Sequence, residues 1–270
     1  MTTGDSPVRY GIHNSVRETD MKVMMTLAAI AATCGTATAQ VATVNGTGSV
    51  AGNGSTSFGG VIGTGSLDIE TLADGTVNMT LNHPGDHFDF TAMYIDSVVG
   101  GVSNTSALSD TADGGRAGLS GLGFGGETSD LGFASGFGAD FGVSWESAFS
   151  GIFDLNSDPS NFGFVSGVIT DSARDASDSA WNISFNMSDI GLSAGDSFKV
   201  VASYLNNGNA FRSGEFIGAD DTGPFPADPN IGQNAWDLGD EDFILVNSVP
   251  APGALALLGL GGLVSVRRSR

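Results

Sequence analysis

Alternation of apolar and polar side chains with a period of two residues restricts the fold of this chain most strongly. From Trp181 to Met187 every second residue is large and apolar, and Asn182, Ser184 and Asn186 lie between them. Successive side chains of a β-strand point to opposite faces of its sheet. The pattern therefore predicts a strand with one buried face and one polar face.

The same alternation flanks a turn at Asp74-Gly75, where residues 66–71 and 76–81 are predicted to form a β-hairpin. Residues 88–99 are apolar on both faces, which predicts a central strand that is covered on both sides. Residues 41–65 are expected to form a weak first strand or an exposed lead-in. Further strands are predicted at 140–145, 152–155, 162–169, 198–205 and 243–246.

Two long segments lack strand patterns. Residues 100–138 are rich in glycine and are predicted to be a loop, and residues 206–242 are predicted to be a long polar connection with three prolines and several acids. The chain then has about eight to ten short strands and no helix of more than a turn or two. This predicts an all-β fold, an antiparallel β-sandwich.

The last 22 residues, from Val249 to Arg270, form a segment of a different kind. Pro250 and Pro252 end the preceding strand, an apolar run follows, and Arg267, Arg268 and Arg270 close the chain. The 16 residues from 251 to 266 would make a helix about 24 Å long, shorter than the roughly 30 Å hydrocarbon core of a membrane. The arginines would stay on the cytoplasmic side, which places the body outside.

These features resemble the sorting signal of PEP-CTERM proteins, the exosortase substrates of bacteria that make extracellular polysaccharide. The resemblance implies transient insertion in the inner membrane, cleavage by an exosortase-type transpeptidase and transfer to a surface carrier. The signature Pro-Glu-Pro reads Pro250-Ala251-Pro252 here, and this departure concerns cleavage more than the sorting class. The alternative is a C-terminal helix packed into the core, but Ser265 is the only polar residue in the run.

The other end of the chain carries the pattern of a signal peptide for the export machinery. Met21 and Lys22 precede an apolar stretch, and the small residues Ala37-Thr38-Ala39 predict cleavage after Ala39. We expect residues 1–20 to be a disordered overrun of the start site, 21–39 a signal helix, 40–248 the β-sandwich domain, and 249–270 the sorting tail with its hydrophobic helix.

Residues 40–248 contain four basic and 27 acidic residues, a net charge of −23, and no cysteine. Such a surface repels nucleic acid and anionic lipid and favours cations. A nucleic-acid function, disulfides and thiolate metal sites are excluded for this domain.

Residues 88–97 (FDFTAMYIDS), 109–117 (SDTADGGRA) and 136–146 (GFGADFGVSWE) resemble the DOMON-like, carbohydrate-binding β-sandwich modules of secreted bacterial proteins. The resemblance implies a jelly-roll-like sandwich that binds sugars or serves as a structural accessory, and it does not imply catalysis.

Asp154, Asn156 and Asp158 have the alternating oxygen ligands of the first half of a calcium loop. Pro159 and Val165 break the second half of that motif, so an ordinary turn is the alternative. A second set of calcium candidates, densely acidic, is Asp237, Asp240 and Asp242, and Asp110 and Asp113 lie beside glycines.

His83 and His87 have a spacing that could hold a transition metal, but Pro84 and Gly85 lie between them, so they cannot share a helical face. The aromatic residues that could stack on sugar rings all fall in predicted strands, where core packing is the favoured role. They are Tyr94, Trp145, Trp181 and Tyr204.

The sequence thus predicts an exported, cell-surface-sorted protein of the envelope or the extracellular polysaccharide matrix, and not an enzyme. The alternative is a carbohydrate-binding module or a carbohydrate-active enzyme. An exposed aromatic sheet face would favour sugar binding, and two facing acids in a cleft would favour hydrolysis.

Overall fold

A computed structural model describes residues 38–48, 59–171, 173–206, 208, 210–219, 235–240 and 242–251. Residues 1–20, nearly all of the predicted signal helix and the hydrophobic helix of the tail lie outside these residues. One compact unit spans Ala37–Ala251. No helix in the described part of the chain is long and apolar enough to cross a membrane.

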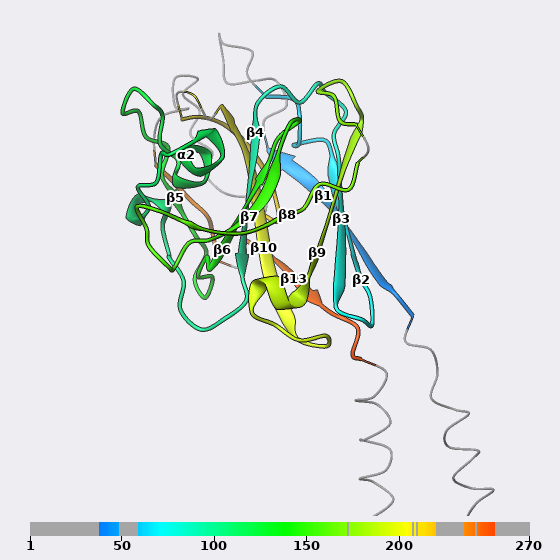
Figure 1. Cartoon of the computed structure of the whole chain (residues 1–270). Helices are drawn as coiled ribbons and strands as arrows, with labels where there is room; N and C mark the ends of the chain where they lie inside the picture. The colour runs from blue at the N-terminus through cyan, green and yellow to red at the C-terminus, as the bar shows by residue number, and fades with distance from the viewer. Residues whose placement is uncertain are drawn as a thin grey trace, which may run out of the picture. The chain divides into compact units, whose positions relative to one another are not determined.

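The described chain is built mainly of antiparallel strands in one 11-stranded sheet (Figure 1). The sheet contains β1 (Gln40–Gly48), β2 (Ser66–Thr71), β3 (Thr76–Asn82), β4 (Phe90–Asp96), β6 (Phe141–Trp145), β7 (Ser150–Asp154), β8 (Gly163–Gly167), β9 (Ala180–Asn186), β10 (Ser197–Asn206), β11 (Phe211–Ile217) and β13 (Ile244–Asn247). Their order is β8-β7-β6-β4-β10-β11-β1-β2-β3-β9, and β13 pairs with β10. The predicted antiparallel β architecture is confirmed at this level.

The two ends of this strand order meet, so the sheet nearly closes into a barrel. Val168, just after β8, donates its amide proton to the Ser150 carbonyl at the start of β7 (3.0 Å). Its own carbonyl accepts the amide proton of Ser184 in β9 (2.9 Å), and Ile169 forms a bridge with Ile183. Closure pairs backbone groups that an open sheet would expose at its edges.

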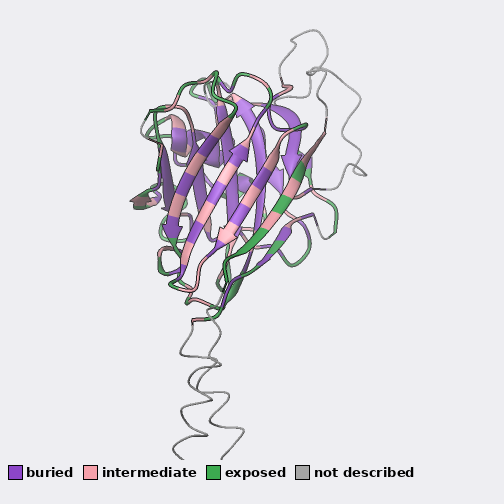
Figure 2. Ribbon diagram, turned by 90° about the vertical axis from the view of Figure 1, so that its right-hand side faces the viewer, coloured by how far each residue is buried: buried purple, intermediate pink, exposed green. Residues whose placement is uncertain are grey.

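No described residues form a layer over the outer face of β1, β2, β3 and β9, and we call these strands the uncovered wall. Buried and partly exposed residues alternate along β2, β3 and β9, as Figure 2 shows. The predicted hairpin is confirmed, since β2 pairs with β3 from Ser66 opposite Asn82 to Thr71 opposite Val77. The predicted weak first strand is the nine-residue β1, which pairs with β2 and β11.

The opposite wall, which we call the covered wall, consists of β4, β6, β7, β10 and β11. In β4, Met93 and Ile95 point into the barrel core, whereas Phe90 and Tyr94 belong to a second core on the outer face. This second core lies under α2 (Gly114–Ser120) and its neighbouring loops, on the side of the molecule away from β2 and β3 (Figure 1). The central strand that the sequence predicts at 88–99 is confirmed.

The covering layer comes from residues 100–138, which were predicted to be loop. The segment contains η2 (Thr105–Ala107), α2 and the short β5 (Leu131–Gly132), which pairs in parallel with β12 (Trp236–Asp237). Asp113 caps the start of α2 by accepting the Arg116 amide proton (2.9 Å), and Gly121 ends it in the left-handed region (φ 67°). Gly118 lets α2 approach the sheet, because a Cβ there would lie 2.6 Å from the Phe90 ring.

The prediction for residues 206–242 was wrong where two strands lie within this segment: the short β12, and β11, which is buried between β10 and β1. Arg212 and Glu215 interrupt its apolar pattern, and this hid the strand. Both charges are buried but bonded. Arg212 donates to the Ser129 side chain and carbonyl, while Glu215 accepts backbone protons from Gly60, Val61 and Gly63 (2.9–3.0 Å).

Candidate functional site

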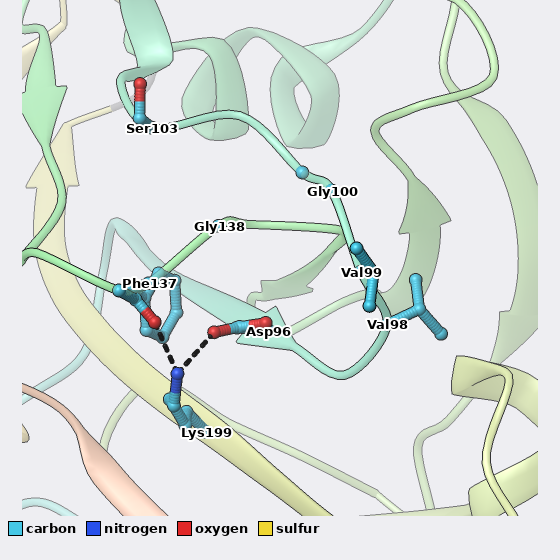
Figure 3. Close-up of a pocket in the computed structure, with 10 residues that line it drawn as sticks. Asp96, Val98, Val99, Gly100, Ser103, Phe137, Gly138 and Lys199 are labelled. Carbon is cyan, nitrogen blue, oxygen red and sulfur yellow. Dashed lines mark hydrogen bonds and ion pairs between the residues drawn. The ribbon is translucent and has the colours of Figure 1, made fainter.

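A pocket of about 390 Å³ lies where β4 ends and β10 begins (Figure 3). The antiparallel register places Lys199 opposite Asp96. The Lys199 ammonium donates to Asp96 Oδ2 (2.9 Å) and to the Gly136 carbonyl, and it lies 4.9 Å from the centre of the Phe243 ring. Phe137 and glycine backbone form much of the remaining lining.

The rim of this pocket is exposed but firmly held. Val98 and Val99 present apolar side chains at the rim. The buried Asp140 accepts the backbone amide protons of Ser97 and Val98 (both 2.8 Å) through Oδ2, and its Oδ1 accepts a proton from the Asn156 side chain (2.9 Å). Asp140 therefore positions the rim.

The lining can bind a small polar molecule. Its volume is within the range of about 300–1,000 Å³ that is common for small-molecule pockets. One ammonium, one carboxylate and several backbone groups offer hydrogen bonds, and Phe137 adds apolar surface. Asp96 is the only acid among the lining residues, so the pocket itself lacks the pair of carboxylates that glycoside hydrolysis requires.

In the first set of calcium candidates, the carboxylates of Asp154 and Asp158 accept hydrogen bonds from residues of their own turns. Asp154 Oδ1 accepts the amide protons of Asn156 (2.9 Å) and Ser157 (3.2 Å), and Asp158 Oδ1 accepts protons from the amide and hydroxyl of Ser160. The Asn156 side chain turns to Asp140 instead. The three side chains thus serve different partners.

The second calcium candidates lie close in sequence but differ in environment. Asp242 Oδ2 accepts the Gly239 amide proton (2.5 Å), Asp237 is an exposed residue of β12, and Asp240 is exposed. Within the described ranges no three His, Cys, Asp or Glu side chains form a cluster that could hold a metal ion. Of the sorting-signal residues, Pro250 and Ala251 end the described chain, and Pro252, Arg267, Arg268 and Arg270 lie outside the described residues.

Asp110 and Asp113 both contact Arg116, but only Asp110 is buried. Asp110 Oδ2 accepts the Phe162 amide proton (2.7 Å) and lies 3.2 Å from Arg116 Nε. Glu146 lies nearby, and its pKa is raised to about 7, first by burial and second by the charge of Asp113. Asp110 thus anchors the covering layer to the turn after β7.

The aromatic residues considered for sugar stacking are core residues. Tyr94, Trp145, Trp181 and Tyr204 are at most 2% exposed, which confirms the packing interpretation. Among the described residues, the large exposed aromatic side chains are phenylalanines instead, and no sequence pattern singled them out. They are Phe88, Phe124, Phe149 and Phe164.

The structure brings His83 and His87 together even though they share no helix. Both lie in the connection between β3 and β4, both are at most 1% exposed, and their ring centroids are 5.2 Å apart. Trp181 packs against both rings, and Tyr204 packs against His87. The argument from helical spacing therefore missed this pair.

Sequence reasoning also missed Asp96, Lys199 and Asp140. Lys199 is the only lysine between residues 40 and 248, and this rarity in an acidic domain was the available signal. Asp140 carries no such signal, because its role depends on the loop that it binds. Comparison of the chain with family models, curated proteins and solved structures found no match.

Proposed function

We propose that this chain is an exported, cell-surface-sorted, non-enzymatic protein of the envelope or the extracellular polysaccharide matrix. One observation carries the proposal: both ends of the described body meet at Thr71. Gln40 pairs with Thr71 at the start of β1, and the Val249 amide donates to Thr71 Oγ1 (3.3 Å). The predicted cleavage points after Ala39 and at 250–252 thus flank one end of the barrel.

This arrangement suits a protein that is processed at both ends. Cleavage after Ala39 and near Pro250 would leave β1 and β13 intact, because these strands begin at Gln40 and end at Asn247. We propose that the hydrophobic tail inserts transiently in the inner membrane and that an exosortase-type transpeptidase then acts on Pro250-Ala251-Pro252.

The distribution of charge supports a role in a hydrated matrix. All four basic residues of the domain are engaged within it: Arg116 with Asp110 and Asp113, Arg174 with Asp171, Lys199 with Asp96, and Arg212 in the covered wall. The other carboxylates therefore dominate the surface. A surface of this kind favours solubility and contacts through divalent cations, calcium included, and disfavours nucleic acid.

We extend the proposal to the finer fold, a flattened, jelly-roll-like sandwich. The uncovered and covered walls face each other across one core that holds side chains from both, such as Met79, Trp181, Met93 and Val143. Two facing sheets with a shared core are what a sandwich requires.

Mass spectrometry of the mature protein from its native cell tests the proposal, because it reads both termini and any attached carrier. We expect an N-terminus at Gln40 and a C-terminus near residues 250–252 in the surface fraction. Replacing Arg267, Arg268 and Arg270 with Ala should cause unprocessed protein to accumulate or be released. A full-length chain that stays inside the cell would refute the proposal.

The Asp96–Lys199 pocket favours a second candidate, carbohydrate binding, over carbohydrate hydrolysis. Isothermal titration with oligosaccharides from the polysaccharide of the native cell should give saturable binding that Lys199→Met abolishes. Asp189→Asn, a change at a partly buried acid of the 3-10 helix η3 (Met187–Ile190) that does not line the pocket, is the control that should bind normally. This site is ruled out if Lys199→Met binds the oligosaccharide as tightly as Asp189→Asn does, or if the unmodified protein does not bind it. Release of shorter sugars would instead indicate an enzyme.

A further inference from the structure

The connection between β3 and β4 holds two imidazoles that the proposed function does not use. His83 directly follows the last residue of β3, Asn82, at the end of the barrel opposite Thr71. His83 Nε2 and His87 Nδ1 are buried and have no hydrogen-bond partner among the described residues. A buried polar atom without a partner is destabilising, so two such nitrogens in neighbouring rings are candidate ligands for an ion.

The remaining ring nitrogens determine the protonation of each imidazole. His83 Nδ1 lies 2.9 Å from the Gly85 carbonyl, which can only accept, so Nδ1 carries the proton and Nε2 keeps a free lone pair. His87 Nε2 lies 2.7 Å from Thr91 Oγ1. The threonine hydroxyl can donate or accept. When it accepts, His87 Nε2 carries the proton and His87 Nδ1 keeps a lone pair, and this is the tautomer that a metal would select.

We propose that His83 and His87 bind one transition-metal ion through these two lone pairs, and that the ion is of the imidazole-preferring class that includes Zn²⁺, Ni²⁺ and Cu²⁺. Metal-bound histidines usually donate their other ring proton to a carbonyl or another acceptor. His83 does so with the Gly85 carbonyl, and Thr91 offers such an acceptor to His87. Calcium and magnesium, which prefer oxygen ligands, are not expected at this pair.

The spacing of the rings fits a shared ion. A ring nitrogen about 2.0–2.1 Å from a metal places the imidazole centroid about 3.2 Å from it, so two rings on one tetrahedral ion have centroids about 5 Å apart. The observed separation is 5.2 Å, with the ring planes at 65°. Trp181 and Tyr204 pack against the rings and restrict their movement.

The histidine pair lies beside a hollow in the surface. His83 lines a hollow of about 400 Å³ together with Asn82, Pro84 and Ser179. Water from this hollow can complete the coordination.

Titration of the metal-free full chain with Zn²⁺, followed by calorimetry, tests the proposal. We expect one equivalent to bind in the presence of excess Ca²⁺, and His87→Phe or His83→Phe to abolish this step. Thr91→Val, which removes the acceptor of the His87 proton, should weaken binding by about 10- to 100-fold. His13→Gln removes the one histidine outside the domain and should leave the affinity unchanged.

A second readout does not depend on the variants folding. In nitrogen-15 NMR of the unmodified protein, one equivalent of Zn²⁺ should shift His83 Nε2 and His87 Nδ1 and leave the two proton-bearing nitrogens bonded as before. Unshifted imidazole signals would overturn the proposal. So would His83 and His87 variants that bind Zn²⁺ as tightly as the unmodified protein does. The latter result would assign the binding to surface carboxylates.

Discussion

Polar side chains have different structural roles in the two walls of the barrel. On the uncovered wall they pair with the neighbouring strand and remain in contact with water, as Asn78 does with Glu70 (2.9 Å). On the covered wall they are buried and join segments that are distant in sequence. Asp110 binds the Phe162 amide, and Arg212 binds Ser129 from β11.

The difference shows that the acidic residues of this chain are not one uniform surface charge. A hydrated side chain that loses its partner regains water, so its bond contributes little net free energy. A buried partner left alone keeps the full cost of desolvation. A few acids on the covered wall therefore determine stability, and the many acids elsewhere determine solubility.

The largest expected effect comes from the acid that connects the covering layer to the turn after β7. Asp110→Ala should lower the free energy of unfolding by about 4 kcal/mol, because it leaves the Phe162 amide and the Arg116 guanidinium without their buried partner. Denaturant unfolding followed by tryptophan fluorescence measures the change.

Asp113→Ala is the matched control, since Asp113 contacts the same arginine but is exposed. Loss of this helix cap should cost only about 1 kcal/mol. Equal losses for the two variants would mean that burial does not separate the roles of the two acids.

The uncovered wall is the part of the fold that could be predicted from sequence. Its strands bury one face, so the alternation from 181 to 187 and the turn at Asp74-Gly75 fix both the strands and their register. The strand β4 could also be predicted, because a strand covered on both sides carries apolar residues on both faces.

The rest could not be predicted, because its determinants are long-range. Arg212 and Glu215 make β11 look like a polar connection, and only the loops at 129 and at 60–63 neutralise that polarity. The same holds for the candidate sites. Asp96 meets Lys199 through the register of β4 and β10, and His83 meets His87 through a loop, and neither pairing follows a local period.

A smaller effect, visible as a pH dependence, is expected at Glu146 beside α2. Its pKa of about 7 in the folded protein lies above the ordinary value of 4.5, so between these values the folded state binds more protons than the unfolded state. Glu146 therefore makes stability fall as pH rises from about 4.5 to 7. Glu146→Gln should remove this fall, measured as the difference in melting temperature between pH 5 and 7.5.

Burial is the larger cause of this shift and the charge of Asp113 the smaller one. Asp113→Asn should therefore reduce the pH dependence only in part. A Glu146→Gln variant with the same pH dependence as the unmodified protein would show that the carboxyl is hydrated, and that the covering layer does not seal this part of the wall.

The smallest effect is expected on the uncovered wall, where Asn78 and Glu70 lie directly opposite each other on β3 and β2. A double-mutant cycle with Asn78→Ala and Glu70→Ala should give a coupling energy of about 0.5 kcal/mol, because both side chains regain water when separated. A coupling above about 2 kcal/mol, in the range of buried charged pairs, would mean that this face is covered in solution. The distinction between the walls would then reflect an unseen partner rather than the fold.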